Sequence, residues 1–452
     1  MNGSRAANRV AVTLDGKGVA SRVGSLLMAE LADRLGLTSA FSTGFAPLVK
    51  RRRRRDPGVA LTHLAVLLAD GGDCLSDLAV LRHQPDLFGQ VASDSTAYRL
   101  LGSGWATDAI VEARKVARER AWSAGAAPES VTLEFDATLV DAHSDKEDAS
   151  PNYKGGFGFH PLCCFVDESD EALAGKLRPG NAGANNADDH IEVLEASIAQ
   201  LPSEWRAGHA RGDDASLVAH PVLVRADSAG ATHDFVDAVV ESNCEFSIGF
   251  HIDQKVRDAL GLAQEEDWVN AIELDGSVRD GASVTELTSL IDLDSWGEGT
   301  RLFSRRERPH PGAQLTLFDV EAGMRHQCFI TNSPGDAATL ELRHRGHARV
   351  EDRIRDAKAM GMRNLPFRDV VPNAAWLQLV LCAMDLVAWT KALCLDGELA
   401  TAEPKRLRYS FLHTAGRVVR SGRGTTIRVQ HHWPWEHEVV TAFRRLRALS
   451  LC

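Results

Sequence analysis

Three acidic residues occupy positions from which their carboxylates can converge. Asp136 lies in the alternating stretch VTLEFDATLVDAH, Asp227 follows the apolar run of HPVLVRADSAG, and Glu351 lies in a charged stretch with helical features. Converging carboxylates repel one another unless a cation lies between them, and a ligand set made only of oxygen suits Mg²⁺ or Mn²⁺. Two such ions activate a water and stabilise a leaving 3′ oxygen in phosphodiester cleavage. We therefore predict that these acids are catalytic and bind two metal ions, although acids at strand ends are also common without catalysis.

The charged stretch RHRGHARVEDRIRDAK, residues 343–358, places further polar groups beside Glu351. At about 100° per residue of an α-helix, four side chains lie within about 40° of Glu351. They are His344, His347, Arg355 and Lys358. Because each can contact a phosphate, we predict that they bind DNA. The simpler alternative is a Glu351–Arg355 ion pair worth about 0.3–0.5 kcal/mol, which leaves both histidines and Gly346 without a reason.

The elements that must position these residues begin at about residue 131. Strand-like alternation and apolar runs are followed by helical periodicity in the order βββαβαβ, which predicts a mixed sheet covered by helices. Residues 256–325 then lack long helices and predict a β-rich insertion, with strands in VRDGASVTELTSLIDL, GTRLFSRRER and AQLTLFDVEAG. HQCFITN is predicted to be one more strand, directly before the helix that carries Glu351.

Helices are expected both before and after the strand-forming residues in the sequence. ALTHLAVLLADGG, SDLAVL and SDSTAYRLLGSG near the N-terminus predict short helices, which either form a helix-turn-helix DNA reader or support a neighbouring domain. Residues 374–395 form the longest apolar stretch, which is interrupted by Gln378, Asp385 and Lys391. Because these residues are costly in lipid, we predict a buried helix and no membrane partner.

The net charge of −11 hides local basic segments. Lys50 and the five arginines after it form the densest run, and residues 401–452 hold ten Lys and Arg against three Glu. DNA binding requires only a local basic surface, and arginines at 417, 420, 423 and 428 around a glycine turn suit contacts to the DNA backbone. Trp433 and Trp435 either stack on bases or close a C-terminal core.

Cysteine usage and the N-terminal sequence indicate where the protein acts. Eight cysteines without a C-x-x-C pair suit reduced thiols. No apolar run follows the first arginine, so we expect a cytoplasmic protein that associates with the nucleoid when it is bound to DNA.

Several motifs together resemble a known family. FDATLVDAHSDKE, YKGGFGFHPL, LRPGNAGANNADDH, RADSAG and the spacing H-x2-H-x3-E-x6-K are similar to the DDE transposases of bacterial insertion sequences, in the branch with a Y-x2-R-x3-E-x6-K signature. The text most resembles the group 1 DDE-domain transposase family, from about residue 10 to 450. His344 stands where the signature has Tyr, and His347 where it has Arg. Because a histidine is mostly neutral at pH 7, its expected interaction with a phosphate is weaker than that of an arginine.

The resemblance implies a fold and an activity. It implies an α/β protein whose ribonuclease H-like mixed sheet carries Asp136, Asp227 and Glu351, with a β-strand insertion between the last two. The domains expected are a helical DNA-binding domain (1–120), the catalytic core (121–255 and 326–395), the insertion (256–325) and a basic C-terminal region (396–452). It also implies a homodimer that binds terminal inverted repeats, cuts double-stranded DNA and joins it to target DNA. The alternatives are a metal-dependent nuclease without strand transfer and a DNA-binding protein whose catalytic site has decayed.

Overall fold

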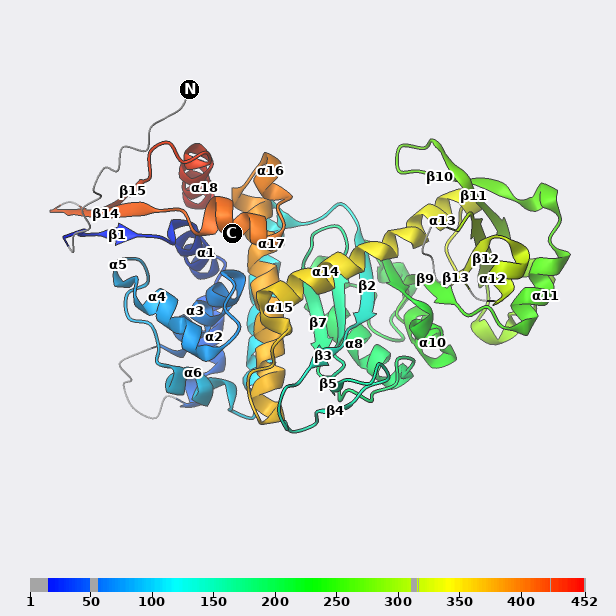
Figure 1. The fold of residues 1–452 in the computed structure, drawn as a ribbon, viewed down its shortest axis with the longest axis horizontal. Helices are drawn as coiled ribbons and strands as arrows, with labels where there is room; N and C mark the ends of the chain where they lie inside the picture. Colours follow the sequence, from blue (N-terminus) through cyan, green and yellow to red (C-terminus); the bar gives the residue numbers. More distant parts are fainter. Residues whose placement is uncertain (1–14, 49–55, 310–314, 316, 423, 451–452) are drawn as a thin grey trace, which may run out of the picture.

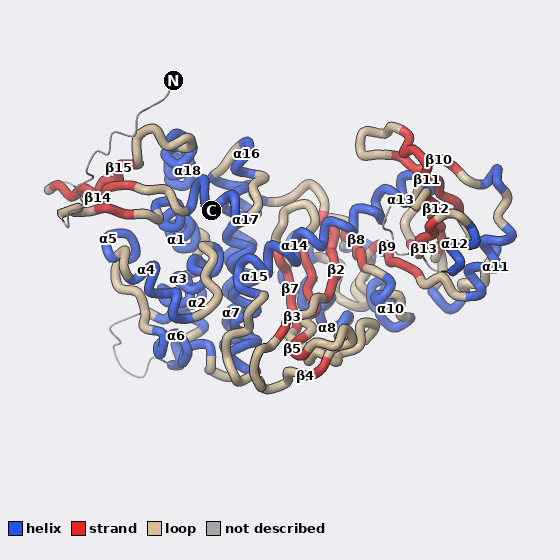
Figure 2. The backbone as a smooth tube through the Cα atoms, in the orientation of Figure 1, coloured by secondary structure: helices blue, strands red, loops and turns tan. Residues whose placement is uncertain are grey.

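The computed structural model describes residues 15–48, 56–309, 315, 317–422 and 424–450. A helical body occupies one end of an elongated molecule, and a long sheet runs from its centre to the other end (Figure 1). The tube in Figure 2 shows mainly helices in the body at one end, from which β14 and β15 project, and most of the strands from the centre to the other end. The predicted arginine run after Lys50 and the predicted DNA contact of Arg423 lie outside the described residues.

One mixed sheet of nine strands forms the framework of the molecule. In sheet order the strands are β10 (Val269–Ile272), β11 (Val278–Glu286), β12 (Arg301–Glu307), β13 (Arg325–Thr331), β9 (Glu245–Phe250), β8 (Val222–Ala226), β2 (Val131–Ala137), β6 (Leu162–Val166) and β7 (Ala172–Lys176). The pairs β2–β8 and β8–β9 are parallel, and the remaining pairs are antiparallel. The mixed sheet predicted from the alternating segments is therefore present.

Helices cover both faces of the central strands. The helices of this half are α8 (Ala187–Gln200), α9 (Ser203–Arg206), α10 (His233–Glu241), α11 (Gln254–Leu262), α12 (Leu317–Ala322), α13 (Ala337–Arg345), α14 (Val350–Ala357) and α15 (Val370–Cys394). Phe135 of β2 contacts His190 of α8 and Phe235 of α10. Successive side chains of a strand point to opposite faces, so Glu134 and Asp136 face the other side of the sheet, against which α14 packs.

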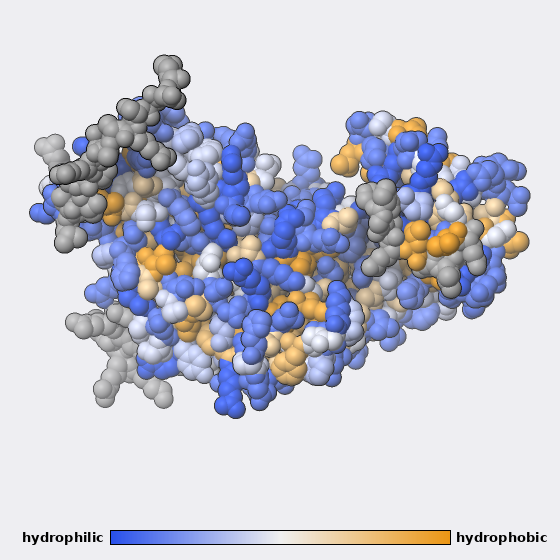
Figure 3. All heavy atoms as spheres, in the orientation of Figure 1, coloured by the Kyte–Doolittle hydropathy of each residue, from blue (hydrophilic) through white to orange (hydrophobic). Residues whose placement is uncertain are grey.

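The insertion extends the core sheet and does not form a sheet of its own. β12 pairs with β13 over seven residues, and β13 pairs with β9 of the core. One prediction within it was wrong: AQLTLFDVEAG contains the helix α12 and no described strand. Its apolar alternation suggested a strand, but Gly323, at φ +66°, follows the helix as a left-handed C-terminal stop. Apolar side chains are exposed at this end of the molecule (Figure 3), including Leu274 and Val278.

The two ends of the chain build the helical body together. Its helices are α1 (Val23–Arg34), α2 (Leu37–Gly44), α3 (Pro57–Ala69), α4 (Leu78–Arg82), α5 (Pro85–Phe88), α6 (Asp94–Leu101), α7 (Ala106–Ala121), α16 (Gly397–Ala400), α17 (Pro404–Leu407) and α18 (Glu436–Ala448). A small sheet in the order β1 (Val19–Ala20), β14 (Gly416–Ser421) and β15 (Gly424–Val429) joins the chain ends, and α1 packs against α18. The segments predicted as separate N-terminal and C-terminal regions are thus one packed unit.

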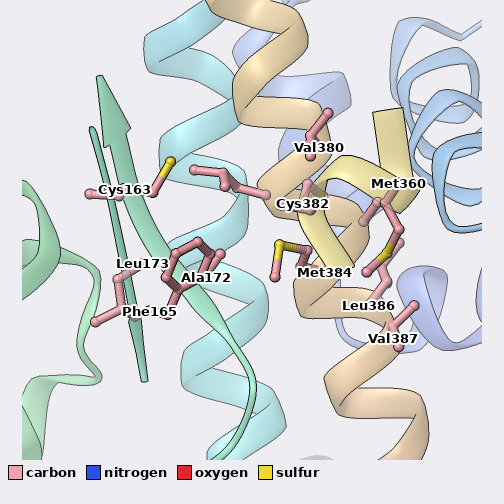
Figure 4. Close-up of a cluster of buried hydrophobic side chains, with 14 of the residues drawn as sticks. Cys163, Phe165, Ala172, Leu173, Met360, Val380, Cys382, Met384, Leu386 and Val387 are labelled. Carbon is pink, nitrogen blue, oxygen red and sulfur yellow. The ribbon is translucent and has the colours of Figure 1, made fainter. Parts of the chain in front are cut away.

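The helix α15 connects the helical body to the sheet. It packs against α3 and α7 on one side and β7 on the other, and Figure 4 shows Cys382 and Met384 of this helix between the β6–β7 strands and Met360. By length and composition it is the one described helix that qualifies as a membrane span, but 83% of its most apolar window is buried. Asp385, which interrupts the apolar sequence, is fully buried and bonded to Arg114 and Arg118 of α7. These contacts support the prediction of a buried core helix.

The segment between β2 and β6 contains a second small sheet that the sequence did not predict. It consists of β3 (Val140–Asp141), β5 (Phe157–Phe159) and β4 (Ser150–Pro151) in that order. Gly158 lies at φ +158°, and a Cβ there would lie 2.1 Å from the carbonyl oxygen of Val140. The glycines of YKGGFGF therefore permit a close backbone approach directly beside the end of β2.

Candidate active site

Asp136 and Asp227 lie side by side at the carboxyl ends of parallel strands. The last register pair of β2 and β8 is Phe135 with Ala226, and each aspartate is near or just beyond this pair in its own chain segment. The Oδ1 atom of Asp136 accepts the amide N–H of Ala137 at 2.7 Å, and Oδ1 of Asp227 accepts that of Ala229 at 2.9 Å. Crevices at the carboxyl ends of such strands are where α/β proteins bind ligands.

Glu351, the third acid, lies on a helical segment that changes from α-helix to 3₁₀-helix and back to α-helix. α13 tightens into a 3₁₀ turn over Gly346–Arg349 before α14 begins. A 3₁₀ turn advances about 120° per residue, so the angles predicted for an unbroken α-helix do not hold across this turn. His344, His347 and Glu351 nevertheless line one cleft, and Glu351 is exposed in the first turn of α14.

Close packing against Arg225 explains the glycine at position 346. A Cβ on Gly346 would lie 2.6 Å from Nη1 of Arg225, whose guanidinium donates to the carbonyl oxygen of Arg343. The close approach of helix and guanidinium therefore requires glycine.

The carboxylate of Asp136 interacts electrostatically with those of Asp227 and Glu351. The pKa of Asp136 is raised to about 6, chiefly by burial; the charge of His347 opposes this rise, and the charges of Asp227 and Glu351 add to it. Asp227, Glu351 and His347 also line one cleft of about 840 Å³. Neighbouring carboxylates repel one another, and a cation between them relieves that repulsion. The structure thus brings together the three acids that lie far apart in the sequence.

The donor set fits a hard divalent cation. All three candidate ligands offer carboxylate oxygens, which Mg²⁺ and Mn²⁺ prefer. In the part of the chain that the structure describes, hydrogen bonds engage Oδ1 of each aspartate and leave Oδ2 available. The tightest described group of potential ligands lies elsewhere, at Asp73, Cys74 and Asp77. There Asp77 caps a short turn by accepting two backbone N–H groups, so we assign no metal to that group.

His347 is held by the protein at the base of the cleft. Its Nδ1 donates to Oε2 of Glu134 at 2.6 Å, because a carboxylate can only accept. Glu134 is fully buried and is also bonded to Arg225. Nδ1 of His347 therefore forms a hydrogen bond with a residue of β2, and Nε2 is the ring nitrogen left to contact DNA.

A buried ion network extends from this contact. Arg225 donates to Asp167 at 2.6 Å, and Nε of Arg349 donates to the same carboxylate at 2.8 Å. These bonds hold the pKa of Asp167 below its ordinary value against the opposing effect of burial. The network joins β2, β8 and the end of β6 to the turn that precedes Glu351. Sequence reasoning missed these residues, although charged residues in otherwise apolar strands, two positions before Asp136 and Asp227, are the signal that identifies them.

His344 lies in the wall of the cleft. Its ring stacks on Phe329 with centroids 4.4 Å apart, and Nδ1 lies 3.0 Å from Oγ of Ser247. Burial, together with the nearby charges of His347 and Arg225, holds the pKa of His344 well below its ordinary value. His344 is therefore a neutral packed ring, and its predicted contact with DNA phosphate stays a prediction.

Arg355 and Lys358 differ in their surroundings. Arg355 is exposed and paired with Asp352 at 2.9 Å and Glu403 at 3.0 Å, so the alternative Glu351–Arg355 pair is not the one formed. Lys358 is half-buried at the start of the π-turn Lys358–Met362. Burial lowers the pKa of Lys358, and the charges of Asp136 and Asp141 oppose that effect. Of the two cations, Lys358 is the one that lies near the acids.

The loop before α8 also reaches the site. Ala184 and Asn185 line a hollow of about 470 Å³ together with Asp227 and Ser228. Arg178 anchors the loop, since its Nη1 lies 3.1 Å from Asp189 and its Nε donates to the carbonyl of His160. The loop RPGNAGANN therefore offers backbone and amide groups beside Asp227.

The chain resembles known proteins to different extents. The family model described as "Transposase DDE domain group 1" matches residues 3–451. A comparison with curated protein sequences gives no match. Among solved structures, the piggyBac transposase in a synaptic complex with hairpin DNA is similar with a TM-score of 0.42 and 11% identity, over 88% of this chain and 83% of that chain.

Proposed function

The chain belongs to the transposases with a group 1 DDE domain, and from that premise we propose that Asp136, Asp227 and Glu351 are its catalytic triad. The chain is thus an enzyme of DNA transposition, and DNA is its partner. This proposal is supported by the position of the two aspartates at the ends of adjacent parallel strands. It is also supported by the electrostatic interaction of Glu351 with Asp136.

We further propose that the five strands β7, β6, β2, β8 and β9 are a ribonuclease H-like core. Support comes from their order and directions: β2 is antiparallel to β6 and parallel to β8, which is parallel to β9. In this proposal the strands β10, β11 and β12 are the insertion of the family.

The triad would hold two Mg²⁺ or Mn²⁺ ions, which supply activation of the attacking oxygen and charge stabilisation of the leaving 3′ oxygen. The protein contributes position and electrostatics, as in other phosphoryl transfers. The carboxylates of Asp136 and Asp227 are fixed by their backbone contacts at the sheet edge. Glu351 is placed across from them by a helix that the Glu134–His347 contact ties to the sheet. Lys358 contributes a cation for a phosphate oxygen near Asp136.

As a complete activity we propose cut-and-paste transposition. The enzyme would bind the terminal inverted repeats of a bacterial insertion sequence as a homodimer in the cytoplasm, cleave the strands and join the 3′ hydroxyls to target DNA. The group 1 DDE domain and the H-x2-H-x3-E-x6-K spacing support this assignment.

Cleavage of a labelled duplex that carries the DNA flanking the gene tests the triad. With Mg²⁺, the wild type is expected to cut at the repeat end, while Asp227→Asn and Glu351→Gln bind the duplex and do not cut. Arg355→Gln is the control, because Arg355 is exposed and paired with Asp352 and Glu403. Cleavage by either triad variant at the wild-type rate contradicts the assignment. Joining of precleaved ends to a plasmid separates a transposase from a nuclease that cannot transfer strands.

A further inference from the structure

The sheet of β1, β14 and β15 carries a row of like charges on one face. Arg417 of β14 pairs in register with Arg428 of β15, and with Val19 of β1 on its other side. Residues directly opposite in an antiparallel pair point to the same face, and like charges there destabilise the pair. Both guanidinium groups are exposed, and neither forms an ion pair with a described residue. The chain thus maintains an unfavourable arrangement on an open surface.

The opposite face of the same sheet is attached to the helical body. Val418 is buried there, and Arg420, which alternates with Arg417, pairs with Asp86 of α5 at 2.6 Å. One face therefore has packing and an acidic partner, whereas the face with Arg417 and Arg428 has neither among the described residues. Figure 1 shows the β14–β15 hairpin projecting from the end of the body.

A hollow of about 370 Å³ accompanies this basic face. Its lining consists of Lys17, Gly18, residues 417–420 and Arg428. Gly18 lies at φ +69°, and a Cβ there would lie 2.4 Å from the carbonyl oxygen of Val418. The amide of Val418 donates to the carbonyl of Gly18 at 2.7 Å, so this glycine permits the contact that brings exposed Lys17 beside the hairpin.

We propose that this face, with Lys17, Arg417 and Arg428, binds the phosphate backbone of duplex DNA. Phosphate oxygens between the opposed cations relieve their repulsion, and arginine presents a fork of donors that suits phosphate. The net charge of the chain is −11, so a cationic face with no acidic partner among the residues that the structure describes is a local exception that favours a polyanion. Exposed Thr426, which alternates with Arg428 onto the same face, offers a further donor to phosphate. This inference rests on the proposed function, and it places a DNA contact on the body opposite the end that carries the insertion.

The full-length Arg417→Gln/Arg428→Gln variant tests this surface. Fluorescence anisotropy measures its binding to a duplex with the element's end and to a scrambled duplex over a series of KCl concentrations. Each lost phosphate contact lowers the slope of log affinity against log salt by about 0.9, so the double variant is expected to lose about 1.8. Affinity for both duplexes is expected to fall by the same factor, because phosphate contacts carry no base information. Arg211→Gln is the control, because Arg211 is paired with Glu241 at 2.6 Å and lies outside the small sheet and its hollow, and its slope is expected to stay near that of the wild type.

Three outcomes overturn the inference: an unchanged slope and affinity in the double variant, a loss confined to the element's own sequence, or an equal loss in Arg211→Gln. Lys17→Gln, which lies outside the strands, provides a second variant if the double variant has a lower melting temperature than the wild type. Mg²⁺-dependent cleavage at saturating DNA distinguishes this inference from the proposed function. If the wild type neither binds nor cleaves, the proposed function fails. If the wild type cleaves and the hairpin variants bind like it, only the basic face is refuted.

Discussion

The Nδ1 atom of His347 lies 2.6 Å from Oε2 of Glu134, a fully buried carboxylate two residues before Asp136. The sequence places His347 where an arginine that contacts DNA is expected, yet the protein itself uses one side of the ring. The contact ties the turn before Glu351 to the strand that carries Asp136. In the proposed site, His347 is therefore a positioning residue for Asp136 and Glu351, which lie on separate elements.

Substitution of His347 separates positioning from DNA binding. His347→Ala is expected to lower kcat by about tenfold to a hundredfold, the range for residues that orient metal ligands, with the KM for DNA little changed. His347→Gln retains a donor for Glu134 and is expected to recover part of the rate. Single-turnover cleavage and DNA titration measure the two parameters. A His347→Ala enzyme with normal kcat and weaker DNA binding shows a direct phosphate contact instead.

The raised pKa of Asp136 makes stability depend on pH and on metal. Because the pKa is about 6 in the folded protein and about 3.9 in an unfolded chain, the stabilising effect of the protonated form is lost as pH rises through about 6. Asp136→Asn is therefore expected to stabilise the metal-free protein at pH 7.5 and above by at most about 3 kcal/mol, with the difference vanishing below about pH 4. Thermal melts over this pH range measure it. Added Mg²⁺ is expected to raise the melting temperature of the wild type but not of the variant; equal shifts in both proteins count against Asp136 as a ligand.

Lys358 and Arg355 are expected to differ in importance although both belong to the predicted stripe. Lys358→Gln removes the cation near Asp136 and is expected to slow cleavage about tenfold to a hundredfold, the effect of losing a hydrogen bond to a charged group. Arg355→Gln removes a cation that is already paired with Asp352 and Glu403, so its effect is expected to be small. Cleavage rates at saturating DNA compare the two variants. Equal losses refute the distinction between them.

Asp385 is expected to be essential for stability and not for chemistry. Its Oδ2 lies 2.9 Å from Nε of Arg114 and 2.7 Å from Nη2 of Arg118, all fully buried. Breaking such a network leaves buried charge without a partner and costs about 3–5 kcal/mol, so Asp385→Asn is expected to lower the urea midpoint strongly. Asp396→Asn, at an exposed pair with Arg445, is the control with little expected change. A midpoint for Asp385→Asn that equals the control's contradicts this role.

The sequence predicted those features that depend on local periodicity. The strands with Asp136 and Asp227, the helix α8 and the buried helix α15 all follow from alternation, helical spacing or apolar length. The pairing of β1 with β14 was not predictable, because it joins segments almost 400 residues apart through backbone groups that every sequence has. The inward turn of His347 depends on a buried partner 213 residues away and on a 3₁₀ turn that periodicity treats as ordinary helix. The alternating apolar residues of AQLTLFDVEAG predicted a strand, but the segment contains the short helix α12, which Gly323 ends.

The pairing of β1 with β14 also has a consequence for synthesis on the ribosome. The chain emerges from its N-terminus, so the three acids leave the ribosome before residues 416–429, which complete the small sheet. The first helices meanwhile lack α15 and α18, against which they pack in the finished protein. A nascent or truncated chain that ends after Glu351 therefore contains all three carboxylates of the proposed triad without the closed helical body.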